Sequence, residues 1–366
     1  MPLSTSPARR LLAGVAASGL LSAGTLGVVW PGGGDPHRAI DGPPGAAGWR
    51  AAVRSVAPGV APPEPDTASP AQVRRFVAKL SEGQRLRLAV RDPGVVGNLD
   101  GMPVALREAA NQRAAEPAAG PHGPKPPGRL LGYDPRGDGR VIEVFGDLAT
   151  ARNVAVLVPG SGWTVRNVMG ARARRGADPV AGAIALRDQL RRLDPGASVA
   201  VVMWLGYDTP EGIDRQAARS ERAVAGAGAL GRFLAALPPS THLSLVCHSY
   251  GAVVCGRAAA TPGIDELVAL GAPGMDTRSA AALRTPARVW AARVPDDPMR
   301  FVPYTRVGPF GHGADPTSPR FGARVLRTGT AHGHGGYYAP GTELLANLAR
   351  IVIDRPSEVT LVDRDH

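Results

Sequence analysis

The sequence predicts an α/β fold: a mostly parallel central sheet flanked by helices, preceded by an N-terminal helical segment. From residue 129 onward, short apolar runs alternate with helical patterns, as expected for parallel strands joined by helical crossovers. These runs are too uniformly hydrophobic for a sheet with one wet face, so we expect strands buried on both faces. A chain of 366 residues with 44% hydrophobic residues can bury such a core.

The N-terminus is typical of an exported protein. Residues 1–10 carry Arg9 and Arg10 and no acid, and residues 11–30 are an uncharged apolar run. This pattern predicts an export signal or a membrane anchor, so we expect a protein that is secreted or held on the outer face of the cytoplasmic membrane by residues 11–30. Residues 31–68 are rich in proline and glycine and predict a linker around one short helix near 49–56.

Residues 69–128 are expected to form the helical segment, with a flexible break at its end. Ser69 followed by Pro70 is a typical helix start, and Ser81 is the expected N-cap of a second helix. The core-facing stripe of the first helix is formed by Val73, Phe76, Val77 and Leu80.

A GNLDGMP motif at 97–103 precedes a polar helix over 104–115. Two interpretations stay open for the motif. It lines the mouth of a binding site, or it is a turn between helices with Asn98 and Asp100 as caps.

Residues 129–354 are predicted to form the α/β domain, followed by a tail at 355–366. RLLGYDP and RVIEVFG flank a Gly-Asp-Gly turn and predict an antiparallel hairpin. Helices are expected over 180–193 and 214–237. Six apolar runs predict the buried parallel strands: 153–160, 198–206, 242–248, 265–274, 287–294 and 322–329.

The stretch LSLVCHSYGAVV, residues 243–254, predicts a strand, a tight turn and a helix with Ser249 at the bend. In α/β-hydrolases this turn is the nucleophile elbow, which needs small residues two positions before and after the nucleophile. Gly251 supplies the second, and Cys247 stands where the first is usually glycine. Ser249 is therefore the candidate nucleophile.

A serine nucleophile needs a histidine base and an acid that orients it, and in this fold they follow in the order serine, acid, histidine. His334 lies in a Gly-rich loop after the last predicted strand and is preferred to His332. Asp297 follows the penultimate strand and is preferred to Asp296, because Pro298 stiffens the loop directly after it. Weaker alternatives for the acid are Asp276 and Asp315.

Two backbone amides are expected to bind the oxyanion formed during acyl transfer. Tyr250 directly follows Ser249 and supplies one amide. Ser161, in the turn VPGSGW after the first parallel strand, supplies the other. This turn lacks the Gly-Lys-Ser/Thr ending of a phosphate loop, so we expect no nucleotide cofactor.

Composition excludes other classes of function. The net charge of +11 comes from scattered arginines without interleaved aromatic residues, so nucleic-acid binding is not expected. The two cysteines, Cys247 and Cys255, both lie in the elbow, where we expect their side chains to diverge without a disulfide. No Cys/His spacing predicts a metal site, and we expect no cofactor.

Seven motifs in order resemble an actinobacterial family of α/β-hydrolase domains of unknown function: GNLDGMP, VPGSGWT, MWLGYDTP, CHSYG, GAPGM, GADPTSPRFGA and GHGGYY. The resemblance covers about residues 69–352, and its main departure is Cys247 where GHSYG is usual. It implies the fold, a helical segment ahead of the domain, and a serine hydrolase site at Ser249, Asp297 and His334. It implies no particular substrate.

The sequence thus predicts a cofactor-free serine hydrolase acting on a small-molecule or lipid acyl ester, as an esterase or lipase does. One alternative is an envelope acyltransferase that uses the same three residues. Another is a non-catalytic envelope binding protein on the same fold. Association with the cell envelope or a membrane fits each of them, and the oligomeric state is not predicted.

Overall fold

The computed structural model of the chain describes residues 42–119, 126–170, 178–212, 215–237 and 242–363. The predicted signal or anchor at 11–30 lies outside these ranges. Among the described residues, no helix has both the length and the apolar character needed to cross a membrane.

The centre of the fold is an eight-stranded sheet in the order β1-β2-β4-β3-β5-β6-β8-β10. The hairpin β1–β2 is antiparallel, β2 joins β4 in antiparallel register, and every later pairing is parallel. The predicted hairpin leading into a parallel sheet is confirmed. The strands are β1 (Arg129–Asp134), β2 (Arg140–Gly146), β3 (Asn153–Val158), β4 (Val199–Leu205), β5 (His242–His248), β6 (Glu266–Leu270), β8 (Arg288–Ala292) and β10 (Arg324–Val325).

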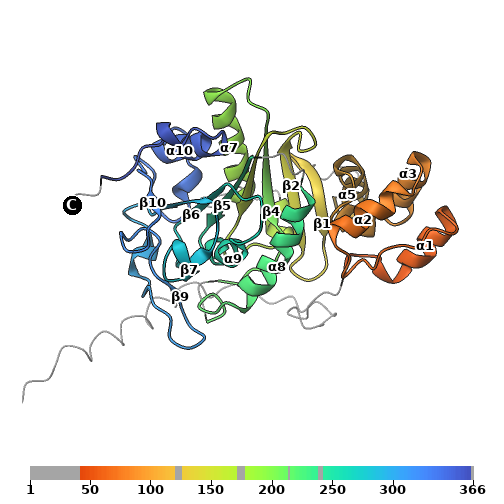
Figure 1. Cartoon of the computed structure of the whole chain (residues 1–366), viewed down its shortest axis with the longest axis horizontal. Helices are drawn as coiled ribbons and strands as arrows, with labels where there is room; N and C mark the ends of the chain where they lie inside the picture. Colours follow the sequence, from red (N-terminus) through yellow and green to blue (C-terminus); the bar gives the residue numbers. More distant parts are fainter. Residues whose placement is uncertain (1–41, 120–125, 171–177, 213–214, 238–241, 364–366) are drawn as a thin grey trace, which may run out of the picture. The chain divides into compact units, whose positions relative to one another are not determined.

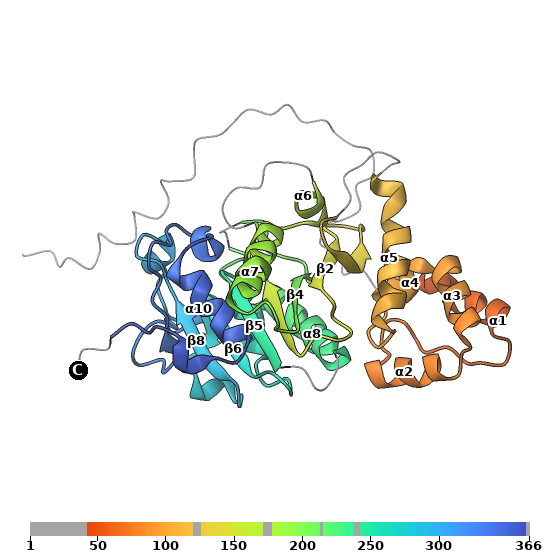
Figure 2. The same ribbon diagram turned by 90° about the horizontal axis from the view of Figure 1, so that it is seen from above.

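Helices cover both faces of this sheet (Figures 1 and 2). In β3, Val154 and Val156 join the apolar cluster that contains α8 (Glu221–Ala236) and α9 (Gly251–Ala258), whereas Leu157 joins the cluster with α7 (Pro179–Leu193) and α10 (Glu343–Val352). A central strand is therefore apolar at every position, because alternate side chains enter two different cores. The remaining helix of the domain is the short α6 (Val165–Met169).

The helix predicted over 214–237 begins only at Glu221, so its predicted start was wrong. Tertiary contacts hold the preceding residues outside the helix. The carbonyl of Arg219 accepts a hydrogen bond from the Tyr250 hydroxyl, the carbonyl of Ala218 accepts one from the Gly311 amide, and the carbonyl of Ala217 lies 2.7 Å from Nε2 of His312. Carbonyls bound in this way are not available to a regular helical ladder.

The edge of the sheet beyond β8 also differs from the prediction. The strand expected at 322–329 is only two residues long, and the C-terminal residues Leu361 and Val362 pair beside it. The predicted tail thus covers an edge whose backbone groups would otherwise be unpaired. A small parallel pair that the sequence does not predict, β7 (Gly274–Thr277) and β9 (His312–Gly313), lies outside the main sheet.

Five helices form the N-terminal segment beside β1: α1 (Trp49–Val56), α2 (Pro70–Ala78), α3 (Glu82–Arg91), α4 (Pro93–Asn98) and α5 (Val104–Ala119). Capping boxes begin α2 and α3, with Ser69 and Ser81 as the predicted N-caps. The α1 helix falls inside the predicted linker, yet its Trp49 and Val53 are fully buried in the same apolar cluster as Phe76. Trp49, with Ala52 and Val53 on the same face, brings this short helix into the core, although the predicted linker around it is rich in proline and glycine.

The GNLDGMP motif joins the helical segment to the sheet. The side chain of Asn98 donates to the carbonyl of Tyr133 on β1 and accepts from the amide of the same residue. Asp100 pairs with the buried guanidinium of Arg107. The motif forms the turn between helices that the second interpretation predicts, joining α4 to α5. Asn98, at the end of α4, also donates to the carbonyl of Gly94, whereas no capping contact of Asp100 is found in the described residues. These contacts give the motif a structural role at the β1 edge.

Candidate active site

Ser249 occupies a strained turn between β5 and α9. Its φ of 54° is in the left-handed region that non-glycine residues rarely adopt, and its amide donates to the carbonyl of Leu270 at 2.9 Å. A Cβ on Gly251 would collide with the carbonyl of Val158, and a Cβ on Gly160 would lie 2.7 Å from the Cβ of Ser249. The turn therefore has the close backbone approach of a nucleophile elbow.

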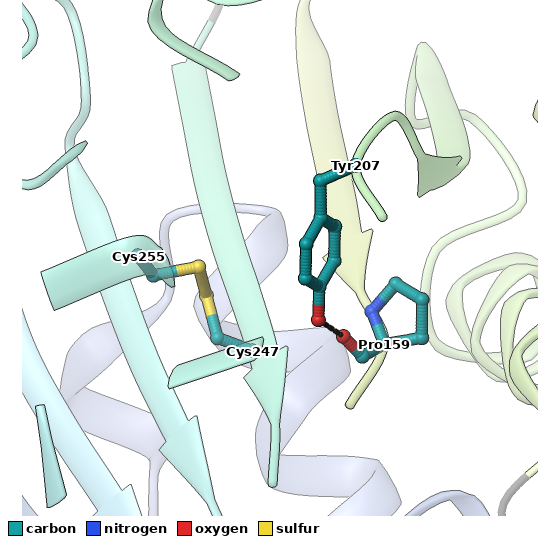
Figure 3. Close-up of a disulfide and its surroundings, with 4 residues drawn as sticks. All are labelled: Pro159, Tyr207, Cys247 and Cys255. Atoms are coloured by element: carbon teal, nitrogen blue, oxygen red, sulfur yellow. Dashed lines mark hydrogen bonds between the residues drawn. A yellow bond between two sulfur atoms is a disulfide. The ribbon is translucent and has the colours of Figure 1, made fainter. Parts of the chain in front are cut away.

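Cys247 and Cys255 are bonded to each other, which overturns the expectation that their side chains diverge (Figure 3). Their Cα atoms are 6.5 Å apart, within the range that a disulfide spans. Strand alternation explains the pairing. Cys247 points to the face of the sheet that α9 covers, whereas its neighbour Val246 points to the other face. The bond ties the end of β5 to α9 across Ser249.

Ser249, Asp297 and His334 come from three separate loops and meet at the carboxyl edge of the sheet. Nε2 of His334 lies 2.9 Å from Oγ of Ser249, and Nδ1 lies 2.9 Å from Oδ1 of Asp297. A carboxylate only accepts, so Nδ1 carries the proton and Nε2 accepts from the serine hydroxyl. The imidazole is one quarter exposed, whereas the Asp297 carboxylate is fully buried.

Hydrogen bonds hold Asp297 in its ionised form. Burial alone would raise the pKa of its carboxyl, but hydrogen bonds from His334, from the hydroxyl of Tyr337 and from the amide of Met299 outweigh burial and hold the pKa below its usual value. Burial and the neighbouring Asp297 carboxylate raise the pKa of Tyr337, so its hydroxyl remains a donor.

The alternative candidates have other partners. Asp296 is exposed and accepts from the amide of Gly333, which shapes the loop before His334. Asp276 pairs with Arg257 and Arg306, and Asp315 pairs with Arg293. His332 is exposed.

His248, which was not among the residues predicted for the site, supports the loop that carries His334. Its side chain is buried, its Nε2 lies 2.7 Å from the backbone carbonyl of His334, and the two rings are 4.7 Å apart. A carbonyl only accepts, so Nε2 of His248 donates. Burial and the nearby His334 lower the pKa of His248 to about 4, and its imidazole is neutral at neutral pH. The only sequence signal was its place beside the bend.

The two amides proposed for the oxyanion flank Ser249. Tyr250 follows it directly, and Ser161 follows Gly160, which packs against it. Among the hydrogen bonds found in the described residues, none engages the amide of either Ser161 or Tyr250. The turn after β3 is fixed by Tyr207, whose buried hydroxyl donates to the carbonyl of Pro159 at 2.7 Å (Figure 3).

One group of side chains within the described residues has the spacing of metal ligands: His242, Glu266 and Asp354. The guanidinium of Arg288 contacts both carboxylates of this group, and Glu266 also accepts from the indole of Trp290. A cation already lies between the two acids. These contacts give the group a structural explanation.

Comparison with known proteins supports the same fold. A family model described as "Alpha/beta hydrolase" matches residues 134–307, which include Ser249 and Asp297. The match, the parallel sheet and the elbow together give the chain the α/β-hydrolase fold that the sequence predicts. They support hydrolase activity in general and do not specify a substrate.

Two relatives are uncharacterized proteins of Mycobacterium tuberculosis (strain ATCC 25618 / H37Rv). One is 28% identical over 375 residues, covering 79% of this chain and 56% of the relative. The other is 30% identical over 144 residues, covering 38% of this chain and 53% of the relative. The chain thus spans about half the length of the curated relatives it matches. Mycobacterial relatives and the family model agree with the resemblance to actinobacterial α/β hydrolases, although they do not test its individual motifs.

Among solved structures, an alpha-beta serine hydrolase homologue from Coxiella burnetii is 15% identical, with a TM-score of 0.35, and the match covers 59% of this chain and 91% of that one. This likeness is too distant to assign roles, which rest on the residues of this chain.

Removing the disulfide should destabilise the fold. The bond closes a short loop, and by loop-closure entropy the double variant Cys247→Ala/Cys255→Ala should lose about 2–3 kcal/mol of unfolding free energy. Guanidinium unfolding of wild type and variant, each with and without a reducing agent, measures this. The reducing agent should affect only the wild type. Two thiols titrating in denatured, unreduced wild-type protein would show that the bond is absent.

His248 should make stability depend on pH. Its folded pKa of about 4 lies below the unfolded value of 6.5, so the unfolded chain binds more protons between these values and stability falls as pH drops through this window. From pH 7 to pH 5 the loss due to His248 should be about 2 kcal/mol. Urea unfolding of wild type and His248→Gln at both pH values measures the difference. Equal losses in the two proteins would contradict the assignment.

Proposed function

We propose that the protein is a serine hydrolase that cleaves acyl esters with Ser249 as nucleophile, His334 as base and Asp297 as the acid that orients His334. The observation that carries the proposal is the continuous chain of hydrogen bonds from Oγ of Ser249 through His334 to Asp297, with the serine on a strained turn. A Ser–His separation beyond hydrogen-bond reach would have favoured a binding protein.

In the acylation step, Oγ of Ser249 attacks the ester carbonyl and its proton passes to Nε2 of His334. Asp297 stabilises the imidazolium that forms, and the amides of Ser161 and Tyr250 bind the oxyanion. The tetrahedral intermediate collapses, His334 returns its proton to the departing alcohol, and the acyl group stays on Ser249. Water then attacks the acyl-enzyme with His334 again as base, releasing the carboxylic acid and the free serine.

We also propose that the protein works outside the cytoplasm. The uncharged run at 11–30 supports export, and the Cys247–Cys255 disulfide supports an oxidising compartment, because such bonds are rare in reducing cytosol. An acyl substrate within the envelope, either a small molecule or a lipid, fits this location.

The nucleophile is tested with a fluorophosphonate probe, which reacts with activated serines. Wild-type protein should be labelled, and mass spectrometry should place the adduct on Ser249. Ser249→Ala should lose both labelling and hydrolysis of a soluble p-nitrophenyl ester. Ser244→Ala, a change of the serine on β5 just before the turn, serves as the matched control and should keep both. Full hydrolysis by Ser249→Ala would refute the proposal.

The acid is tested by comparing two adjacent aspartates. Asp297→Asn should lower kcat on the order of 10⁴-fold, because an amide cannot hold the imidazole in the required tautomer. Asp296→Asn should lower it far less, since the hydrogen bond found for the Asp296 side chain among the described residues is to the amide of Gly333 and not to His334. Steady-state kinetics, with circular dichroism to confirm folding, measures both. Equal, small losses would point to a different acid.

A further inference from the structure

The loop at 298–311 carries an unusual concentration of exposed apolar side chains. Phe301 is 73% exposed, Val307 71% and Phe310 43%. They are three of the eight large hydrophobic side chains that are exposed in the described part of the chain, and they fall within fourteen residues. Single exposed apolar residues are ordinary, but a cluster on one loop marks an interaction surface.

The same loop makes polar contacts on its inner side. The hydroxyl of Tyr304 donates to the carbonyl of Met299 and accepts from Arg293, Arg306 pairs with the buried carboxylate of Asp276, and the amide of Gly311 donates to Ala218. Val307 and Phe310 exchange two backbone hydrogen bonds around the tip. These contacts hold the loop in place, while Phe301, Val307 and Phe310 stay exposed beside Arg300 and Arg306.

Both ends of the loop are attached to the candidate active site. It starts at Asp297, whose carboxylate accepts from the amide of Met299. It ends against residues 217–219, and the carbonyl of Arg219 accepts from the hydroxyl of Tyr250, the residue after Ser249. The loop is therefore tied at both ends to residues that contact or adjoin the candidate catalytic residues.

The charge of the loop is positive. Residues 298–311 contain Arg300 and Arg306 and no acid. The guanidinium of Arg300 lies 4.5 Å from the ring centroid of Phe301. That of Arg219, which is paired with Glu221, lies 5.5 Å from the ring centroid of Phe310. Arg306 shares Asp276 with Arg257, so two cations meet one carboxylate there.

We propose that the 298–311 loop docks onto an anionic lipid membrane surface and so presents Ser249 to it. Phenylalanine and valine side chains would enter the boundary between headgroups and acyl chains, while the adjacent arginines bind lipid phosphates. A protein partner fits less well, because a stable interface needs about 800 Å² per partner, more than three partly exposed apolar side chains supply. Docking goes beyond the proposed hydrolase activity, and it makes a lipid-borne ester the substrate class.

A dye attached to the loop tests the proposal in the full chain. Single cysteines replace Phe301 or Val307, and Leu86→Cys on α3 is the matched control because Leu86 is 53% exposed. The native cysteines are buried and bonded to each other, so each variant carries one reactive thiol. The thiol is labelled with nitrobenzoxadiazole and mixed with vesicles of equal parts phosphatidylcholine and phosphatidylglycerol that contain a nitroxide-labelled phospholipid.

The dyes at 301 and 307 should be quenched by the nitroxide, and the dye at 86 should not. Any attachment through residues 1–30 is common to all three variants, so the difference reports the loop alone. Arg300→Gln should weaken insertion of the loop about fivefold, the effect of one arginine near an anionic surface. Arg87→Gln on α3 is its charge-matched control and should leave insertion unchanged.

Equal quenching at all three positions, or none at 301 and 307, would overturn the proposal. A dye signal that grows with protein concentration in the absence of lipid would instead identify an interface between proteins, which also overturns it.

A second experiment measures ester hydrolysis. It compares the loop variant Phe301→Ser/Val307→Ser with the control variant Leu86→Ser/Val90→Ser on α3. The loop variant should hydrolyse a soluble ester at the wild-type rate and a vesicle-embedded ester at least tenfold more slowly than the control variant. A difference of less than twofold between the two variants on the vesicle-embedded ester would be evidence against docking. If no variant or wild type hydrolyses any ester, the hydrolase proposal fails while the quenching still decides the docking.

Discussion

The left-handed backbone of Ser249 is the constraint on which the candidate site depends. A non-glycine residue in this region costs on the order of 1–3 kcal/mol, and the cost persists only where surrounding structure enforces it. Here three kinds of contact enforce it: the carbonyl of Leu270 binds the serine amide, Gly160 and Gly251 allow backbones to touch, and the Cys247–Cys255 bond links the two sides of the turn. The covalent link contributes a free energy of similar size to the strain. Cysteine in place of the usual glycine therefore reinforces the turn.

The loop that carries His334 is held at two points, by a charged hydrogen-bond acceptor and by a neutral hydrogen-bond donor. The buried carboxylate of Asp297 accepts from the ring of His334, and the buried, neutral ring of His248 donates to the backbone of the same residue. Tyr337 and Met299 add donors to Asp297, which keep its charge stable without exposing it to water. A proton can then move between Ser249 and His334 while the groups behind them keep their positions. The apolar loop that starts at Asp297 connects this arrangement to the outer surface.

Much of the fold and the core of the site could be predicted from the sequence, because they depend on patterns of residues that are close together in the chain. Uninterrupted apolar runs such as 153–158 specify strands buried on both faces, and Ser69 and Ser81 specify helix starts through their own capping hydrogen bonds. The position of each candidate after a predicted strand pointed to the edge where the carboxyl ends of parallel strands meet. Pro298 then favoured Asp297 over Asp296, and the Gly-rich loop favoured His334 over His332.

Only the tertiary structure decided the features that depend on which side chains face each other across the chain. Alternation along β5 and the packing of α9 bring Cys247 to Cys255, and the folding of the histidine loop brings His248 under the carbonyl of His334. The late start of α8 follows from hydrogen bonds that Tyr250 and Gly311 make to residues 218 and 219. Composition and local pattern, by themselves, determined most of the strands and helices of this protein and the three residues of its candidate site. Packing decided the bonds between residues that are distant in sequence or face each other across a turn. No local pattern specifies these bonds, because they depend on which faces of strands and helices come together.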